Sequence, residues 1–348
     1  MLIPIAISHE QLQIMKPKAI KLLKTASPII VGTALLLLTM NCSGKFPTTT
    51  ATVSSSTTDT KSIDKKNDNS SEESPPQISQ ITNSTYQLIW SGGFQKSDWQ
   101  TYWGVQSKGA WGLQENTAVI SDPTGKFAKV LRVKYPKGSA SPNAVRKEGA
   151  PLGGAQFYAK LGMTPQDALL LSYSVRFSDN FEFVKGGKLP GLYGGTAVSG
   201  GNIPDGIDGF STRFMWRKNG DGEVYAYLPT STEYGTSIGR GNWRFQPGVW
   251  YKIEQEVTLN QPGKADGRVR VWLDNRLVLE QGGLTFRTVN TLKIEGIFFS
   301  TFFGGEDTTW APSKDVSADF ADFKVSKPSG VALTPSPSPL PLVSSKIN

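Results

Sequence analysis

Histidine and cysteine are almost absent from this sequence of 348 residues: His9 is the only histidine and Cys42 the only cysteine. A single cysteine excludes an internal disulfide. We expect the stretch that holds His9 to be removed as a leader. Its loss would exclude every mechanism that needs a histidine base, a histidine partner for a nucleophile or a histidine metal ligand. An enzyme made from this chain would therefore use Tyr, Lys, Arg, Asp, Glu, Ser or Thr.

Long amphipathic helical patterns are also missing, whereas 36 glycines, 22 prolines and 10% aromatic residues favour strands and turns. Apolar residues alternate or run together in segments 129–136, 155–162, 168–178, 250–259, 268–281, 293–305 and 318–326. One of these segments contains a predicted hairpin around Asp274 and Asn275. The pattern predicts an all-β fold, a jelly-roll β-sandwich of two antiparallel sheets with a concave substrate groove.

The two ends of the chain differ in composition from its centre. Four lysines precede an apolar run over residues 26–40, which is too short for a membrane span and typical of an export signal. The stretch "LLLLTMNCSG" resembles a bacterial lipobox and predicts lipidation of Cys42. The alternative is a secreted or N-terminally anchored protein with an incidental cysteine. We expect a leader over residues 1–42, a disordered Ser/Thr-rich tether over 43–85, one folded domain over 86–327 and a disordered Pro/Ser-rich tail over 328–348.

The stretch "GFSTRFMWRKNGDGEVYAYLP", from Gly209 to Pro229, predicts a hairpin whose two faces differ. If Phe214 and Trp216 point into the core, alternation requires an odd number of loop residues. A two-residue turn would mix the faces, so we expect a three- or five-residue loop with Gly220 or Gly222 in the left-handed region. The outward face would then carry four polar side chains: Ser211, Arg213, Tyr225 and Tyr227. An ordinary sheet surface can also carry such a set.

Several motifs occur in a characteristic order: "GGKLPGLYGG" at 186–195, "FSTRFMW" at 210–216, "YAY" at 225–227, and "IFFSTFFGG" at 297–305 followed by Trp310. Together they resemble polysaccharide lyase family 14, which contains alginate and glucuronan lyases. The resemblance implies a jelly-roll fold and a polyuronate substrate. It also implies a catalytic set that consists of Lys188, Ser211, Arg213, Tyr225 and Tyr227.

These residue types suit β-elimination, in which a base removes the C5 proton of a uronate and the 4-O-linked sugar leaves. Lys188 and Arg213 would neutralise the adjacent carboxylate, with Ser211 as a further donor. Neighbouring cations favour a phenolate, so a tyrosine can replace the missing histidine base. We favour Tyr227 as base and acid with Tyr225 assisting, although the pattern leaves the choice between the two tyrosines open.

Four further residues are candidates for substrate binding. Arg240 and Arg244 could contact uronate carboxylates, or they could be solvated loop arginines. Tyr193 and Trp243 could stack on sugar rings, or they could serve packing.

No cofactor and no metal are expected, and the sequence "PDGIDG" is more typical of a turn than of a calcium site at Asp205 and Asp208. The net charge of +8 suits an acidic polysaccharide as partner. Nucleic acid is not expected, because no basic run or binding motif is present. We expect a monomer that meets the membrane only through a lipid on Cys42, as a secreted or cell-envelope lipoprotein.

The leading functional hypothesis is thus a secreted or lipid-anchored polyuronate lyase. The main alternative is a carbohydrate-binding module of the same sandwich type without catalysis. A glycoside hydrolase would need paired carboxylates, and no Asp or Glu pair on adjacent inward strands recommends it.

Overall fold

The computed structural model describes residues 85–329. The predicted leader with Cys42, the tether up to residue 84 and the tail from residue 330 on lie outside these residues. The first strand begins at Tyr86 and the last one ends at Pro328. Among the described residues no helix has the length and apolar character needed to cross a membrane.

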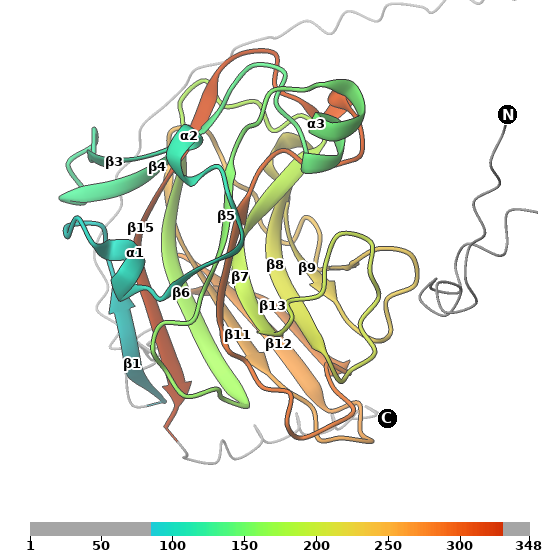
Figure 1. The fold of residues 1–348 in the computed structure, drawn as a ribbon. Coiled ribbons are helices and arrows are strands. Elements are labelled where there is room, and N and C mark those ends of the chain that lie inside the picture. Colours follow the sequence, from blue (N-terminus) through green and yellow to red (C-terminus); the bar gives the residue numbers. More distant parts are fainter. Residues whose placement is uncertain (1–84, 330–348) are drawn as a thin grey trace, which may run out of the picture. The chain divides into compact units, whose positions relative to one another are not determined.

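Two antiparallel sheets stack as a β-sandwich of the jelly-roll type, which confirms the predicted fold class (Figure 1). In spatial order, the first sheet contains β13 (Arg276–Leu284), β12 (Gly267–Leu273), β11 (Trp250–Thr258), β6 (Ala168–Phe177), β15 (Val316–Pro328), β4 (Lys129–Tyr135) and β3 (Thr117–Ser121), with β1 (Tyr86–Gly92) paired to β15. The second sheet contains β10 (Thr236–Ile238), β9 (Gly222–Tyr227), β8 (Gly209–Arg217), β7 (Gly186–Gly195), β14 (Gly296–Thr301), β5 (Ala155–Ala159) and β2 (Val105–Trp111).

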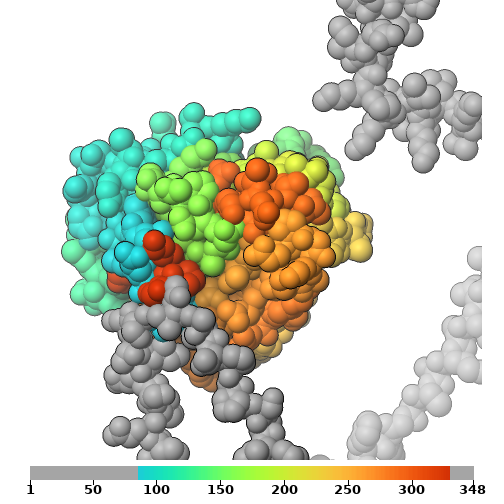
Figure 2. Space-filling model, turned by 90° about the horizontal axis from the view of Figure 1, so that it is seen from below, coloured from blue at the N-terminus to red at the C-terminus, as the bar shows by residue number. Residues whose placement is uncertain are grey.

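Helices are short and lie in the connections, as the lack of amphipathic helical patterns predicts. The α-helices are α1 (Trp99–Tyr102), α2 (Leu113–Asn116) and α3 (Pro142–Glu148), and single 3₁₀ turns cover Lys218–Gly220 and Thr308–Trp310. α3 begins where the Ser141 side chain accepts a hydrogen bond from the amide of Ala144 and ends at Gly149 in the left-handed region. The start and end of the described chain lie side by side in Figure 2, because β1 pairs with β15.

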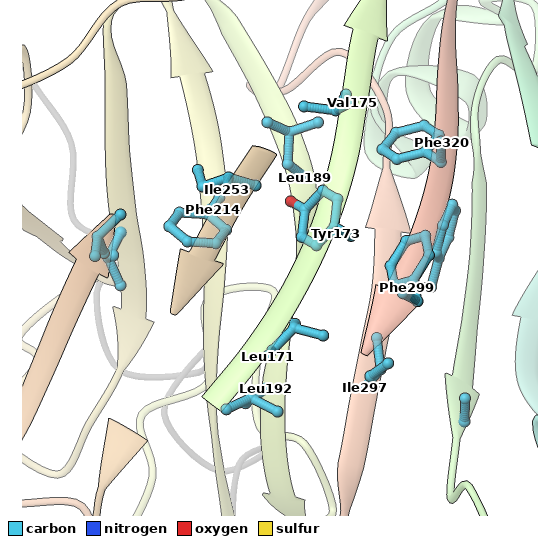
Figure 3. Packing of buried hydrophobic residues seen from close by; sticks show 14 of the residues in the cluster. Leu171, Tyr173, Val175, Leu189, Leu192, Phe214, Ile253, Ile297, Phe299 and Phe320 are labelled. Carbon is cyan, nitrogen blue, oxygen red and sulfur yellow. The ribbon is translucent and has the colours of Figure 1, made fainter. Parts of the chain in front are cut away.

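Apolar side chains from both sheets fill the space between them (Figure 3). Tyr173 of β6 packs against Phe214 of β8 with ring centroids 6.4 Å apart, and so joins the two sheets. Phe214 and Trp216 are both 0% exposed, which confirms their predicted place in the core. Truncation of such a ring to alanine would cost about 3–5 kcal/mol of stability. The second sheet is therefore a firm platform for the side chains on its outer face.

The predicted hairpin at Asp274 and Asn275 is confirmed. Both residues have positive φ, 49° and 67°, and the flanking Leu273 and Arg276 pair directly, so the turn has two residues.

β7 is a central strand that the sequence pattern did not predict as one. It contains Pro190 and several glycines, which are uncommon inside a central strand. The structure accommodates the proline by a β-bulge, because the pairing with β8 shifts between Leu189 and Leu192. Residues five apart lie on opposite faces of a regular strand, but the extra residue brings Lys188 and Tyr193 to the same outer face.

Candidate active site

The loop between β8 and β9 has three residues, Lys218–Gly220, because the amide of Arg217 donates to the carbonyl of Asp221 at 2.7 Å. Asn219 and Gly220 both have positive φ, 61° and 82°. This confirms the prediction of an odd loop with Gly220 in the left-handed region, where a residue without Cβ is favoured. Gly222 instead pairs with Trp216 inside the hairpin.

The odd loop sets the register of the hairpin. Arg213 pairs with Tyr225 and Ser211 pairs with Tyr227, so the four side chains share the outer face of the second sheet. The next strand, β7, adds Lys188 to this face, because Lys188 pairs with Met215 two residues beyond Arg213. The five residues of the predicted catalytic set thus come together on three adjacent strands.

The ammonium of Lys188 lies 2.9 Å from the sulfur of Met215 and 4.2 Å from the centroid of the Tyr225 ring. Within the described residues it forms no ion pair. The side chain keeps some exposure, yet burial of the amine is the main cause that lowers its pKa well below the ordinary value, and Arg213 and Arg217 lower the pKa further. A negative group that bound beside Lys188 would relieve this unfavourable environment.

Arg213 is 3% exposed and also has no carboxylate partner among the described residues. Its Nη1 donates to Ser300 Oγ at 3.1 Å, and its Cζ lies 4.5 Å from the centroid of Phe298. Its Nε is buried without a hydrogen-bond partner. Burial lowers the pKa of Arg213 to about 10. A buried guanidinium with an unused donor is a binding group for an anion.

The two tyrosines differ in their surroundings. The Tyr227 hydroxyl accepts a hydrogen bond from the amide of Gly201 at 3.2 Å, and such a donor stabilises an oxygen that gains negative charge. Burial, with Tyr227 close by, raises the pKa of Tyr225 to about 12. The two ring centroids are 5.7 Å apart with planes at 85°.

Ser211 Oγ donates to the carbonyl of Val198 at 2.8 Å, so a contact with substrate would compete with that bond.

Comparisons with known proteins identify the family of the chain. Residues 123–323 match the family model described as Polysaccharide lyase 14. The chain belongs to polysaccharide lyase family 14. The solved alginate lyase from Aplysia kurodai is 32% identical, with 69% of this chain and 98% of that chain covered and a TM-score of 0.60. The alginate lyase vAL-1 from a Chlorella virus is 22% identical, with 69% and 100% covered and a TM-score of 0.58, which shows the fold alone. No curated protein sequence matched.

A buried carboxylate in this family 14 lyase escaped the sequence analysis. Glu223 of β9 is 0% exposed and accepts from Arg217 Nε at 2.7 Å, from Ser237 Oγ at 2.6 Å and from Arg240 Nε at 2.6 Å. The same alternation that groups Tyr225 and Tyr227 also puts Glu223 on the outer face, so parity could have found it. Glu223 holds Arg217 beside the candidate catalytic set, because Arg217 Cζ lies 5.4 Å from the centroid of the Tyr225 ring.

Ser300 and Gln156 were missed for a different reason. Ser300 Oγ donates to Gln156 Oε1 at 3.2 Å, so a chain of hydrogen bonds runs from Arg213 across β14 to β5. The strands that carry these residues are far apart in the sequence, and their adjacency depends on sheet order. No local pattern predicts that adjacency.

The four residues predicted for substrate binding differ in their exposure to solvent. Trp243 is 3% exposed and packs in the core at 6.1 Å from Phe214, so the packing alternative describes it. Tyr193 lies on the outer face opposite Ser211 but is also only 3% exposed. The side chains of Arg240 and Arg244 are 51% and 61% exposed and pair with Glu223 and Asp221.

Loops pass over this face from both sides. The Tyr234 hydroxyl, in the connection between β9 and β10, donates to Glu306 Oε1 at 2.5 Å, and Glu306 lies in the connection between β14 and β15. β8 and β7 separate β9 from β14 in the sheet, so this hydrogen bond joins loops from the two sides of the candidate set.

A metal centre is not indicated in residues 85–329, where no cluster of His, Cys, Asp and Glu has the geometry of a metal site. Asp205 Oδ1 accepts from the amides of Ile207 and Asp208, at 2.7 Å and 3.0 Å, which is the hydrogen bonding of a turn.

Two cavities of about 250 Å³ each lie away from the candidate catalytic set, one beside Arg132 and Asp315, the other beside Gln95 and Lys324. The candidate site is therefore defined by its side chains and not by either cavity.

Proposed function

We propose that this chain is a lyase that cleaves a polyuronate such as alginate or glucuronan by β-elimination at the outer face of the second sheet. One observation carries the proposal. Two cations, Lys188 and Arg213, sit in dehydrated positions beside two phenols and have no carboxylate partner among the described residues. Desolvated cations without counter-ions are costly, and an anionic substrate supplies the missing charge.

The chemistry follows from the positions of these groups. Arg213 and Lys188 bind the carboxylate of the uronate residue that is cleaved and stabilise the enolate-like charge that develops when C5 loses its proton. Tyr227, as phenolate, takes that proton, and the double bond between C4 and C5 forms as the C4–O bond breaks. The Tyr227 phenol then gives the proton to the leaving oxygen. Tyr225 assists, and Ser211 adds a donor once it leaves the carbonyl of Val198.

The first experiment is ultraviolet absorbance during incubation of the full chain with polymannuronate, polyguluronate, glucuronan and a neutral glucan. The proposal predicts new double-bond absorbance with at least one polyuronate and none with the neutral polymer. Arg213→Ala abolishes the signal, whereas the matched variant Arg276→Ala, on β13 of the other sheet, keeps it. Binding of polyuronate without new absorbance would instead support a non-catalytic carbohydrate-binding module.

We also propose that the chain is exported and lipid-anchored, which the sequence around Cys42 supports. In a bacterial host, wild-type chain would partition with membranes and incorporate labelled fatty acid, and Cys42→Ser would do neither. Equal behaviour of the two would leave simple secretion as the alternative. We expect the enzyme to be a monomer, which size-exclusion chromatography with light scattering tests.

A further inference from the structure

We propose that Tyr158 and Gln156, on β5, form an additional sugar-binding position that holds the uronate residue next to the one bound by Arg213. This inference rests on the proposed function and extends the same site across the sheet. Neither residue belongs to the set that the sequence motifs indicated.

Tyr158 shares a platform with Arg213. The Tyr158 ring packs on the Phe298 ring with centroids 4.5 Å apart and planes at 32°, and Arg213 Cζ lies 4.5 Å from the centroid of that same Phe298 ring. The arginine and the tyrosine are therefore neighbours on one aromatic surface. A polymer with a carboxylate on Arg213 would pass its adjoining sugar close to Tyr158.

Tyr158 is the accessible aromatic residue of this group. Phe298 is 0% exposed and Tyr193 is 3% exposed, whereas Tyr158 is partly exposed. Within residues 85–329 the Tyr158 hydroxyl forms no hydrogen bond. A flat apolar ring with an unused polar tip matches a sugar, which offers C–H groups on its face and hydroxyls at its edge.

Gln156 adds directional polar groups. It lies two residues before Tyr158 and so on the same face of the strand. Its Oε1 accepts from Ser300 and its Nε2 donates to the carbonyl of Gly109 at 3.1 Å. An amide nitrogen carries two donors, so one N–H is left for an oxygen of the ligand. Through Ser300 the same side chain also fixes Arg213, so the two positions are linked.

The test is the dependence of binding on oligomer length. Dissociation constants for a ladder of polyuronate oligomers, from the disaccharide upward, are measured by calorimetry in chains that also carry Tyr227→Phe, which slows turnover. Tyr158→Ala weakens binding of the longer oligomers by roughly tenfold and leaves the shortest oligomers that bind Arg213 unchanged. Tyr158→Phe keeps the ring and restores the part of the affinity that stacking supplies, and the remaining loss measures the contribution of the hydroxyl. Tyr102→Ala is the matched control, because Tyr102 is 51% exposed and stacks on Trp90 in a different part of the fold.

The outcomes separate the two proposals. A loss that is equal at every length, or no loss at any length, would overturn the additional sugar position. If Tyr158→Ala shows the predicted loss for longer oligomers but the wild-type chain cleaves no polyuronate, only the lyase activity would be contradicted. Failure to bind any uronate oligomer would overturn both.

Discussion

The ammonium of Lys188 lies over the ring of Tyr225, 4.2 Å from its centroid, and the guanidinium of Arg217 approaches the same ring at 5.4 Å. A ring face attracts cations, but two cations so close together also repel each other. Glu223 neutralises Arg217, whereas Lys188 has no ion-pair partner in residues 85–329. The face is therefore arranged to receive an additional anion beside Lys188.

Tyr227→Phe should lower kcat by about 10²–10⁴, the usual contribution of a general base, with little change in KM. Tyr225→Phe should lower kcat less, because the pKa of about 12 at Tyr225 disfavours the phenolate. Steady-state kinetics on polyuronate with both variants measures the difference. Full activity of Tyr227→Phe, or a larger loss in Tyr225→Phe, would contradict the assignment of Tyr227 as the base.

Lys188→Met should abolish most activity and yet raise the stability of the fold at neutral pH. Burial lowers the pKa of Lys188 in the folded state, so the protonated amine costs stability below that lowered pKa. The cost fades as pH rises from the lowered pKa towards the ordinary lysine value of about 10.4. Thermal unfolding of both proteins from pH 7 to pH 10.5 should show a gain in Tm for the variant that shrinks with rising pH. A variant that is less stable at pH 7 would contradict this account of Lys188.

Glu223→Ala should destabilise the fold by about 3 kcal/mol, because it removes a fully buried carboxylate and leaves Arg217, whose side chain is only 14% exposed, without its partner. Glu280→Ala removes a surface partner of Arg268 at 3.6 Å and should change stability by no more than about 0.5 kcal/mol. Urea unfolding of the three proteins at pH 7 provides the comparison.

The stability that Glu223 contributes should also depend on pH. Burial alone would raise the pKa of Glu223, but Arg217, Ser237 and Arg240 outweigh it and hold the pKa below its usual value. This stability is present above the unfolded value of about 4.3 and is lost as pH falls through the lower folded pKa. The difference between wild type and Glu223→Ala should accordingly narrow in acid. A difference that stays constant down to pH 3 would show that charge is not its source.

Tyr234→Phe should loosen the loops over the candidate site without unfolding the sandwich. The variant loses the hydrogen bond to Glu306, worth about 1 kcal/mol. Hydrogen–deuterium exchange should accelerate at residues 229–235 and 304–307, while strands β7 and β8 keep their protection. Unchanged exchange in both loops would mean that the Tyr234–Glu306 bond does not hold them together.

Local alternation was enough to predict part of this structure. The odd loop and the pairing of Arg213 with Tyr225 follow from the demand that Phe214 and Trp216 point inward. The all-β sandwich follows from the strand pattern, and the turn at Asp274–Asn275 from its residue types. In each case residues close in the sequence determine the geometry.

The rest depends on contacts between distant segments. Pro190 hid β7 from the strand pattern, because only the bulge against β8 makes a central proline acceptable. The hydrogen bonds from Arg213 to Ser300 and from Ser300 to Gln156 exist because β14 neighbours β7 and β5 neighbours β14. No local rule determines this order of strands. The sequence could not predict the burial of Tyr193 and Trp243 either, since an aromatic residue in a loop or strand can serve packing or binding.

The chemical nature of the products tests the central claim most directly. Mass spectrometry of a complete polyuronate digest by the wild-type chain should show oligomers that are lighter by one water than hydrolysis products and carry a C4–C5 double bond. The same digest with Arg213→Ala should show intact polymer. Saturated oligomers, or wild-type chain that binds the polymer and leaves it intact, would contradict β-elimination at the site formed by Lys188, Arg213, Tyr225 and Tyr227.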